Sequence, residues 1–491
     1  MSRLFKTTWH HLGLCMVLCL VMGLVLTACG SSTDTVAPAA TTASATTAAA
    51  TTAAATTSAA AGAATTTAAA GAATTAAAPG AIPPPAVPNA AAAKKFSGQT
   101  ITVSIDSAGP GAQTDQQLVD QFTKDTGIVV KSNLHPDSAS DYYASLTRLF
   151  QGKSNDIDVM TIDVIWPGAF APNLLDLTPV LGDTANKLLL DTAVQNDTIG
   201  GKLVAMPFFG DFGILYYRTD LLKKYGFSAP PKTWDELEQQ AKKIQDGEKA
   251  SNPQFAGFVW QGKAYEGLTC DALEWIASSG GGTIIDQSGK VTLNNPNAVK
   301  ALNRAKGWIG TISPTGVTSY QEEDARNVWG AGNAAFMRNW PYAYSLSADP
   351  TKSKVAGNFD VAPLPADSGS QPSGTLGGWQ MAVNKYTKNP DASIEFVRYM
   401  TSNEVSKWRA VTGSYVPLNK EVLNDPDVIK TNPYLASTKE VVRVVRPSRT
   451  TGVDYNEVST YFFQGVAKVL AGQDASSVLS DVQNKIQGVL K

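Results

Sequence analysis

The chain has 491 residues, a formal net charge of −2 and 17% charged residues. Its 40 basic and 42 acidic side chains nearly balance and form no runs of one sign, which argues against nucleic acid as a partner. The 3 histidines and 4 cysteines leave little for metal or histidine chemistry, so we expect no metal and no cofactor.

Residues 1–28 have the pattern of a bacterial lipoprotein signal peptide. Arg3 and Lys6 precede an uncharged apolar run, which closes in the sequence LTAC and so ends at Cys29. That order of charged, apolar and small residues is typical of an export signal. A lipid on Cys29 would hold the mature chain at the outer face of a membrane. An uncleaved membrane anchor is the alternative, although the run is short for a span of about 20 residues.

Residues 29–93 are predicted to form a disordered tether. They are mostly Ala and Thr, with Gly and then Pro toward the end, and almost nothing in them is large and apolar. Such a composition cannot bury a core. A flexible coil of about 60 residues averages about 40–45 Å from end to end, so the tether would hold a folded body away from the membrane.

The folded part is expected to run from residue 94 to residue 491 and to begin with alternating strands and helices. We predict strands over residues 100–106, 128–134 and 157–163, and helices over residues 115–125 and 138–151. Such alternation is typical of a mostly parallel sheet with helices on both faces. Ligands bind these sheets at the carboxyl ends of the strands, and Asp163 lies at such an end.

A second set of strands and helices begins at residue 212. We predict strands over residues 212–218, 255–260, 359–364 and 379–383, and helices that start at residue 233 with a capping box and cover residues 267–279, 390–408 and 455–491. Two sets of this kind indicate an α/β protein built from two lobes with a cleft between them.

Two carboxylates precede or follow predicted strands in positions that suit a ligand. Asp163 ends an apolar strand, and Asp211 follows Phe209 and Gly210 just before one. A carboxylate there can accept two hydroxyl hydrogen bonds, which suits a sugar. Each residue could instead cap a turn or a helix. A further alternative is a pair of glycosidase carboxylates, one acting as acid and the other as base or nucleophile.

Aromatic residues accompany these acids in predicted loops. Trp340 and Tyr342 flank a proline, and Trp379 follows Gly378. Flat rings cover the C–H faces of a sugar at little cost in side-chain entropy, whereas a single ring of this kind could equally belong to a core. Arg446 precedes a proline and offers a guanidinium that could fork onto hydroxyls or form a surface salt bridge.

Several longer motifs resemble those of a known family. They include GGKLVAMP ending at Pro207, YYRTDLLKKYG at 216–226, PPKTWDEL at 230–237, GFVWQGK at 257–263, RNWPYA at 338–343 and TLGGW at 375–379. These segments resemble the family 1 extracellular solute-binding proteins of ABC importers and, more narrowly, the trehalose/maltose-binding proteins. The resemblance is dense over residues 201–282 and thinner after residue 384.

The resemblance implies a periplasmic-binding-protein-like fold of type II, with two lobes joined by three hinge crossings. One lobe would hold residues 94–207 and 358–412, and the other residues 208–357 and 413–491. It also implies that the cleft is lined by Asp163, Asp211, Trp340, Tyr342, Gly378, Trp379 and Arg446.

The sequence departs from the family near three positions of the implied site. Gln113 stands near where relatives carry Glu, Tyr143 near where they carry Arg, and Phe209 where Tyr is common. We include these three residues among the ligand-binding candidates. Each change removes a polar group or a charge, so the choice of sugar is open, with trehalose first and maltose or related α-linked sugars next.

The predicted function is that of an extracytoplasmic, lipid-anchored protein without catalytic activity. It would act as a monomer, close on a disaccharide or short oligosaccharide, and dock on the ABC permease subunits in the membrane. A secreted glycoside hydrolase using Asp163 and Asp211 is the alternative, and a cell-surface adhesin ranks behind both.

Overall fold

The computed structural model describes residues 82–286, 288–438 and 441–491. The predicted signal peptide, the lipidation site Cys29 and the predicted tether up to residue 81 lie outside the described residues. Within the described ranges, no helix is both long and apolar enough to cross a membrane.

The last part of the predicted tether packs against the folded body. Trp408 Nε1 donates to the carbonyl of Ile82 at 3.0 Å, and the Tyr399 hydroxyl donates to that of Pro85 at 2.8 Å. Residues Ala90–Ala93 form helix α1, in which Ala93 is buried. The prediction that disorder extends to residue 93 is therefore wrong for residues 82–93, because backbone carbonyls can be bound by a neighbouring surface whatever the side chains are.

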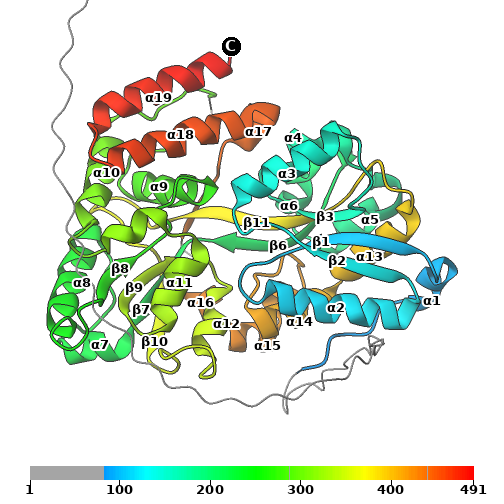
Figure 1. Cartoon of the computed structure of the whole chain (residues 1–491), viewed down its shortest axis with the longest axis horizontal. Coiled ribbons are helices and arrows are strands. Elements are labelled where there is room, and N and C mark those ends of the chain that lie inside the picture. Colours follow the sequence, from blue (N-terminus) through cyan, green and yellow to red (C-terminus); the bar gives the residue numbers. More distant parts are fainter. Residues whose placement is uncertain (1–81, 287, 439–440) are drawn as a thin grey trace, which may run out of the picture. The chain divides into compact units, whose positions relative to one another are not determined.

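The first sheet has six strands in the order β12-β11-β3-β1-β2, with β6 beside β11 (Figure 1). The strands are β1 (Thr100–Ile105), β2 (Val129–Leu134), β3 (Val159–Asp163), β6 (Met206–Phe212), β11 (Ser373–Val383) and β12 (Val442–Val444). β1 runs parallel to β2 and β3, but β11 runs antiparallel to β3 and β6. The sheet is thus mixed rather than mostly parallel, because β11 returns to it from another part of the chain.

Helices cover both faces of this sheet, as the alternating strands predicted (Figure 1). Ile101 and Val103 of β1 pack in one core with Val119 of α2, whereas Met160 and Ile162 of β3 pack in another with α3. The helices of this region are α2 (Gly111–Thr126), α3 (Ala139–Gln151), α4 (Pro167–Phe170), α5 (Thr178–Leu188), α6 (Asp191–Asn196), α13 (Pro390–Met400), α14 (Asn403–Gly413) and α15 (Pro426–Thr431). A two-stranded sheet of β4 (Thr198–Ile199) and β5 (Lys202–Leu203) lies among them.

The second sheet has four strands in the order β10-β7-β9-β8. They are β7 (Ile214–Arg218), β8 (Ala256–Val259), β9 (Ala334–Asn339) and β10 (Phe359–Ala362). Around it lie α7 (Thr219–Lys224), α8 (Trp234–Glu248), α9 (Glu266–Ser278), α10 (Pro296–Trp308), α11 (Glu322–Gly330), α12 (Ala343–Ala348), α16 (Tyr434–Ser437), α17 (Ser448–Thr451), α18 (Tyr455–Leu470) and α19 (Ala475–Val489). The predicted capping box is present, since Thr233 and Glu236 exchange hydrogen bonds at the start of α8.

Two segments that were each predicted to form one helix contain two helices in the structure. The segment 390–408 divides at Ser402, whose hydroxyl accepts from the Val405 amide and so starts α14. The segment 455–491 divides near Gly472, which has a φ of +107°, and Asp474 caps α19. Both breaks arise from a capping side chain that the apolar spacing alone does not reveal.

The chain passes between the two sheets at several points, and this arrangement positions the site. β6 of the first sheet leads directly through Gly213 into β7 of the second, and β10 of the second leads into β11 of the first. The chain leaves the first sheet again after β12, which pairs with β11 although its residues were predicted to lie in the second lobe.

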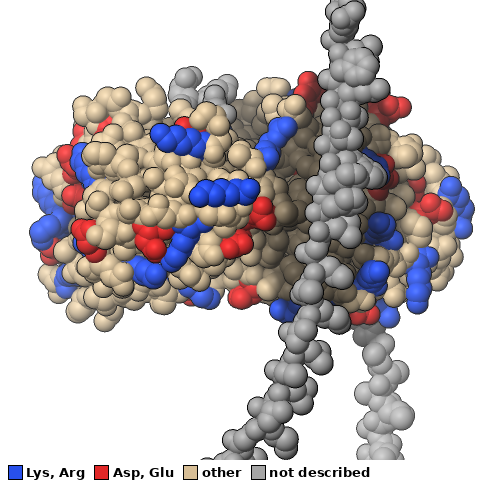
Figure 2. Space-filling view, turned by 90° about the horizontal axis from the view of Figure 1, so that it is seen from above, with Lys and Arg blue, Asp and Glu red and all other residues tan. Residues whose placement is uncertain are grey.

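On the face shown in Figure 2, acidic and basic side chains are interspersed.

Candidate functional site

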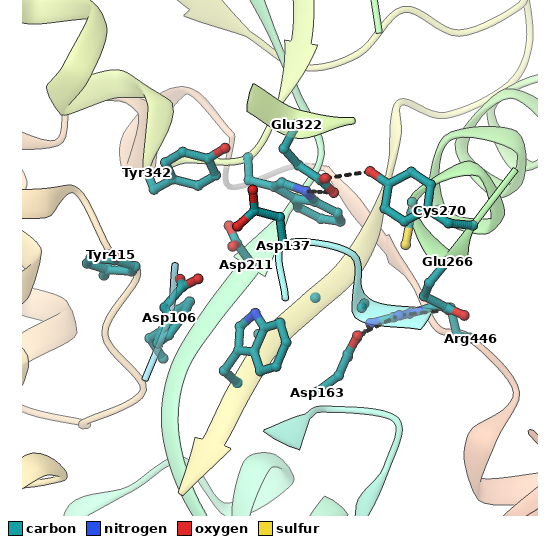
Figure 3. A pocket seen from close by; sticks show the side chains of 18 residues that line it. Asp106, Asp137, Asp163, Asp211, Glu266, Cys270, Glu322, Tyr342, Tyr415 and Arg446 are labelled. Atoms are coloured by element: carbon teal, nitrogen blue, oxygen red, sulfur yellow. Dashed lines mark hydrogen bonds and ion pairs between the residues drawn. The ribbon is translucent and has the colours of Figure 1, made fainter. Parts of the chain in front are cut away.

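A cavity lies between the two sheets, at the carboxyl ends of β1 and β3 (Figure 3). Together with the open space at its mouth, it contains about 670 Å³ that is free of protein atoms. It is lined by Asp106, Asp137, Ala139, Asp163, Phe209, Asp211, Tyr265, Glu266, Gly267, Cys270, Glu322, Trp340, Tyr342, Gly377, Gly378, Trp379, Tyr415 and Arg446.

An ion-pair cluster joins the two sides of this cavity. The Arg446 guanidinium donates from Nη2 to Asp163 Oδ1 at 2.8 Å and from Nη1 to Glu266 Oε1 at 2.9 Å. Asp163 ends β3 of the first sheet, whereas Glu266 begins α9 beside the second. Burial alone would lower the pKa of Arg446, but Asp163 and the other neighbouring groups raise it well above its usual value. Arg446 is therefore a permanent cation that bridges the two sides (Figure 3).

Two further carboxylates on the cavity wall are held in a different electrostatic state. Burial raises the pKa of Asp211 well above its usual value, and the charge of Arg338 offsets part of that effect. Burial also raises the pKa of Glu322, which accepts hydrogen bonds from the Tyr265 hydroxyl and, at 3.3 Å, from Trp340 Nε1. A buried carboxylate with a raised pKa is stabilised in its ionised form by hydroxyl groups that donate hydrogen bonds to it.

The aromatic wall of the cavity is held in place from behind. Trp379 lies stacked on His135 with ring centroids 5.2 Å apart, and Trp166 meets it edge to face at 5.7 Å. The Trp340 ring has the Arg338 guanidinium 4.0 Å from its centroid. Since these partners fix the rings in advance, a ligand that stacks on them would lose little binding free energy in ordering them.

Gly378 allows the backbones of two strands to approach each other closely. It has a φ of +127°, and a Cβ there would stand 2.5 Å from the Phe209 carbonyl oxygen. The close approach that Gly378 permits is thus to strand β6, where β11 has a bulge between Trp379 and Gln380. Trp379, beside this bulge, lines the cavity, and a side chain at position 378 would disturb the strand pairing next to it.

Most of the residues predicted from the sequence lie together on the cavity wall. They are Asp163, Phe209, Asp211, Trp340, Tyr342, Gly378, Trp379 and Arg446. Gln113 is an exposed residue of α2 and lines a separate surface pocket. The Tyr143 ring packs on Phe170 with centroids 4.8 Å apart, away from the cavity. Gln113 and Tyr143 are therefore not brought to the cavity. Asp211 lies within β6 rather than before a strand.

Several acids of the cavity were missed by the sequence analysis. Asp106 follows β1 as Asp163 ends β3, so the rule that singled out Asp163 could have found it. Glu266 lies directly after Tyr265 in a segment that carries the family resemblance, although no local pattern marks its role. Asp137 and Glu322 reach the cavity from a loop and from the first turn of α11, and no sequence signal indicates this.

The titratable groups of the described ranges form no cluster suited to a metal ion. Cys270 is buried at the cavity wall as a free thiol, and burial raises its pKa well above the usual value. A buried thiol of this kind stays protonated and is therefore unreactive.

The chain is similar in sequence to one family of known proteins. The profile of the bacterial extracellular solute-binding proteins matches residues 107–407. A probable ABC transporter-binding protein of Deinococcus radiodurans is 50% identical over 387 residues, which cover 78% of this chain and 92% of that protein.

Solved structures agree with that result. The maltose-bound MalE3 protein of T. maritima is 35% identical, with a TM-score of 0.75, and the match covers 80% of this chain and all of that one. The acarbose-binding receptor of Streptomyces glaucescens is 25% identical, with a TM-score of 0.69, over 80% of this chain and 98% of that one. The predicted two-lobed α/β fold is thereby confirmed.

Proposed function

Because this chain belongs to the bacterial extracellular solute-binding proteins, we propose that its cavity captures an α-linked disaccharide for an ABC importer. Trehalose is the first candidate and maltose the next. The observation that carries this proposal is the wall of the cavity, where Trp379 and Trp340 accompany the carboxylates of Asp163 and Asp211. Rings that stack on sugar faces and acids that accept hydroxyl protons are what recognition of a neutral sugar requires.

The proposed mechanism is closure of the two lobes around the sugar. Hydroxyls of the sugar would bind Asp163 and Asp211 on the first sheet, and the rings of Trp340 and Tyr342 would cover it from the second. A ligand that touches both sides binds the closed form better and shifts the population toward it. Gly213, between β6 and β7, belongs to the proposed hinge.

We keep the predicted membrane attachment as part of the proposal. A lipid on Cys29 and the segment up to residue 81 would keep the monomeric receptor beside its permease. Mass spectrometry of the purified membrane form should find a lipid-modified Cys29 at the mature N-terminus. If Cys29 carries no lipid, or if residues 1–28 are still attached, the protein is not a lipoprotein.

Calorimetric titration of the mature chain tests the proposed substrate. We expect trehalose, maltose and sucrose to bind with one site per chain, with the tightest binding for trehalose, while sugar alcohols and amino acids bind weakly. A change in tryptophan fluorescence should accompany the heat because Trp340 and Trp379 contact the sugar. A panel of di- and oligosaccharides that gives no heat would remove sugar capture as the function.

The hydrolase alternative is less favoured, because both oxygens of Asp163 accept from Arg446. A carboxylate whose two oxygens both accept from a guanidinium is a weakened nucleophile, because its lone pairs are already engaged. Prolonged incubation of trehalose or maltose with the protein, followed by chromatography, should return the intact disaccharide. Release of glucose that disappears in an Asp211→Asn variant would favour hydrolysis instead.

A further inference from the structure

A second contact joins the two sides at the rim of the cavity, through Gly109, Glu323 and Tyr342, of which only Tyr342 lines the cavity. Residues 106–110 form the turn between β1 and α2 on the first-sheet side. Glu323 lies in the first turn of α11, which packs on β9 of the second sheet. Its neighbour Glu322 lines the cavity, whereas the Glu323 carboxylate reaches the turn 106–110.

The Glu323 carboxylate holds groups from both sides at once. Its Oε1 atom accepts from the Gly109 amide at 3.2 Å and from the Tyr342 hydroxyl at 2.7 Å. Its Oε2 atom accepts from Arg326 Nε at 2.7 Å, which fixes the carboxylate on α11. Glu323 therefore orients Tyr342, a residue of the cavity wall, and ties the opposite turn to the same oxygen.

The turn and the Tyr342 ring touch so closely that a glycine is required between them. Gly109 has a φ of +58°, and a Cβ there would stand 2.4 Å from Tyr342 Cδ2. Any side chain at this position would push the turn away from the ring. The contact is made by protein groups alone, so it does not depend on a ligand.

A second hydrogen bond crosses the cavity in the same way. The Glu266 amide of α9 donates to Ser140 Oγ of α3 at 3.1 Å. This hydrogen bond joins a helix on the first-sheet side to a helix on the second-sheet side. The two contacts lie on different elements, and both would break if the lobes separated.

We propose that Glu323 is a positioning residue that holds the rim of the cavity closed before the sugar arrives. It acts through Gly109 and Tyr342 and touches no part of the bound ligand. The effect on sugar affinity rests on the proposed function, whereas the effect on closure of the sugar-free protein does not. Since apparent affinity scales with the fraction of protein in the competent form, loss of this contact weakens binding without removing a ligand contact.

The test compares Glu323→Ala with Glu323→Gln in the absence of sugar. The glutamine keeps an oxygen that can accept from Gly109 and Tyr342, while the alanine removes it. Spin labels on Lys124→Cys and Lys249→Cys, exposed residues of α2 and of the segment after α8, report the distance between the two sides. The chain would start at residue 30, which removes every cysteine except the buried Cys270.

We expect one short distance for the parent protein and for Glu323→Gln, and an added longer distance for Glu323→Ala. Gly109→Ala should give the longer distance as well, by a different physical cause. Equal distance distributions for the parent and Glu323→Ala would overturn the proposal, and so would a Glu323→Gln variant that opens as far as the alanine. Melting curves of each variant show whether it is folded.

A second measurement follows the sugar. With trehalose, Glu323→Ala should release the ligand about tenfold faster than the parent, as expected for the loss of one hydrogen bond to a charged group, and Glu323→Gln should stay within about twofold. An unchanged release rate in an alanine variant that opens would separate closure from affinity and overturn that part of the proposal. Failure of all variants to bind sugar would count against the proposed function alone.

Discussion

Two buried arginines with similar partners differ in what they connect. Arg338 of β9 binds Glu274 with Nε and Nη2 at 2.8 and 2.5 Å, and Gln261 with Nη1 at 2.9 Å, all on the second-sheet side. Arg446 binds Asp163 of the first-sheet side and Glu266 of the second across the cavity. A cluster within one side holds the fold together, whereas one that spans both sides can respond to a ligand.

The partners of the two arginines also differ in their access to water. Asp271 and Glu274 beside Arg338 are 0% exposed, whereas Asp163 and Glu266 line the cavity. A carboxylate that loses the Arg338 cation remains buried and unpaired. A carboxylate that loses the Arg446 cation can be hydrated in part by water in the cavity.

Arg338→Ala should therefore have the largest effect on stability. Breaking one partner of a buried ion pair costs about 3–5 kcal/mol, because the remaining charges cannot be solvated. Urea unfolding should show this loss for Arg338→Ala and a loss of less than half for Arg446→Ala. Equal losses in the free energy of unfolding for the two variants would mean that the two clusters contribute equally to stability.

Arg446→Lys should have the largest effect on binding. A lysine keeps the charge but cannot reach Asp163 and Glu266 with two forked donors, so the geometry of both acids relaxes. We expect trehalose affinity to fall by about 2 kcal/mol while the urea midpoint changes little, the typical scale for a hydrogen bond between charged groups. Arg338→Lys is the matched control, and it should lower stability more than affinity.

Trp379→Ala comes next in expected size. Removal of a stacked ring should weaken sugar binding by about 1.5 kcal/mol, the lower end of what burial of a large apolar side chain contributes. Trp379→Phe keeps part of that surface and should recover about half of the loss. Calorimetry at one pH measures both variants, and an affinity unchanged in the alanine variant would place the sugar away from this ring.

The pH dependence of binding should be the smallest effect. Burial raises the pKa of Asp211 in the unliganded protein, and hydroxyl donors from a sugar would lower it again. Binding then releases protons, so affinity should fall as pH drops through the raised pKa and be fully present above it. For folding of the unliganded protein the sign is opposite, since a raised pKa favours the folded form at low pH.

Asp211→Asn serves as the control for that titration. We expect it to bind more weakly at neutral pH and to lose the dependence on acid pH, which can be followed by titrations between about pH 8 and about pH 5. It should also melt at a higher temperature than the parent at neutral pH, because a buried charge has been removed. A parent protein whose affinity is flat over this range would contradict the role given to Asp211.

Local patterns in the sequence predicted much of the fold and part of the site. The alternation of strands and helices located β1, β2 and β3, and the end of β3 located Asp163. They missed β9, because its six residues are buried throughout and show no alternation of polar and apolar side chains. They missed the mixed pairing of the first sheet, because the return of β11 is a long-range event.

Specific structural features keep two of the predicted site residues away from the cavity. Gln113 was included because it stands near where relatives carry Glu, but α2 begins at Gly111, earlier than its apolar spacing indicated, and this side chain is exposed. Tyr143 follows Tyr142, and it is Tyr142 whose ring packs toward the core, stacked on His135 at 4.2 Å. Which of two neighbouring residues on a helix faces inward depends on packing that a single sequence does not reveal.

A crystal structure of the mature chain with trehalose tests the central claim most directly. We expect the disaccharide in the cavity between the two sheets, with one ring against Trp379 and its hydroxyls within hydrogen-bond distance of Asp163 and Asp211. The Arg446 cluster should remain in place beside it. Trehalose bound elsewhere on the protein, with this cavity empty, would contradict the account.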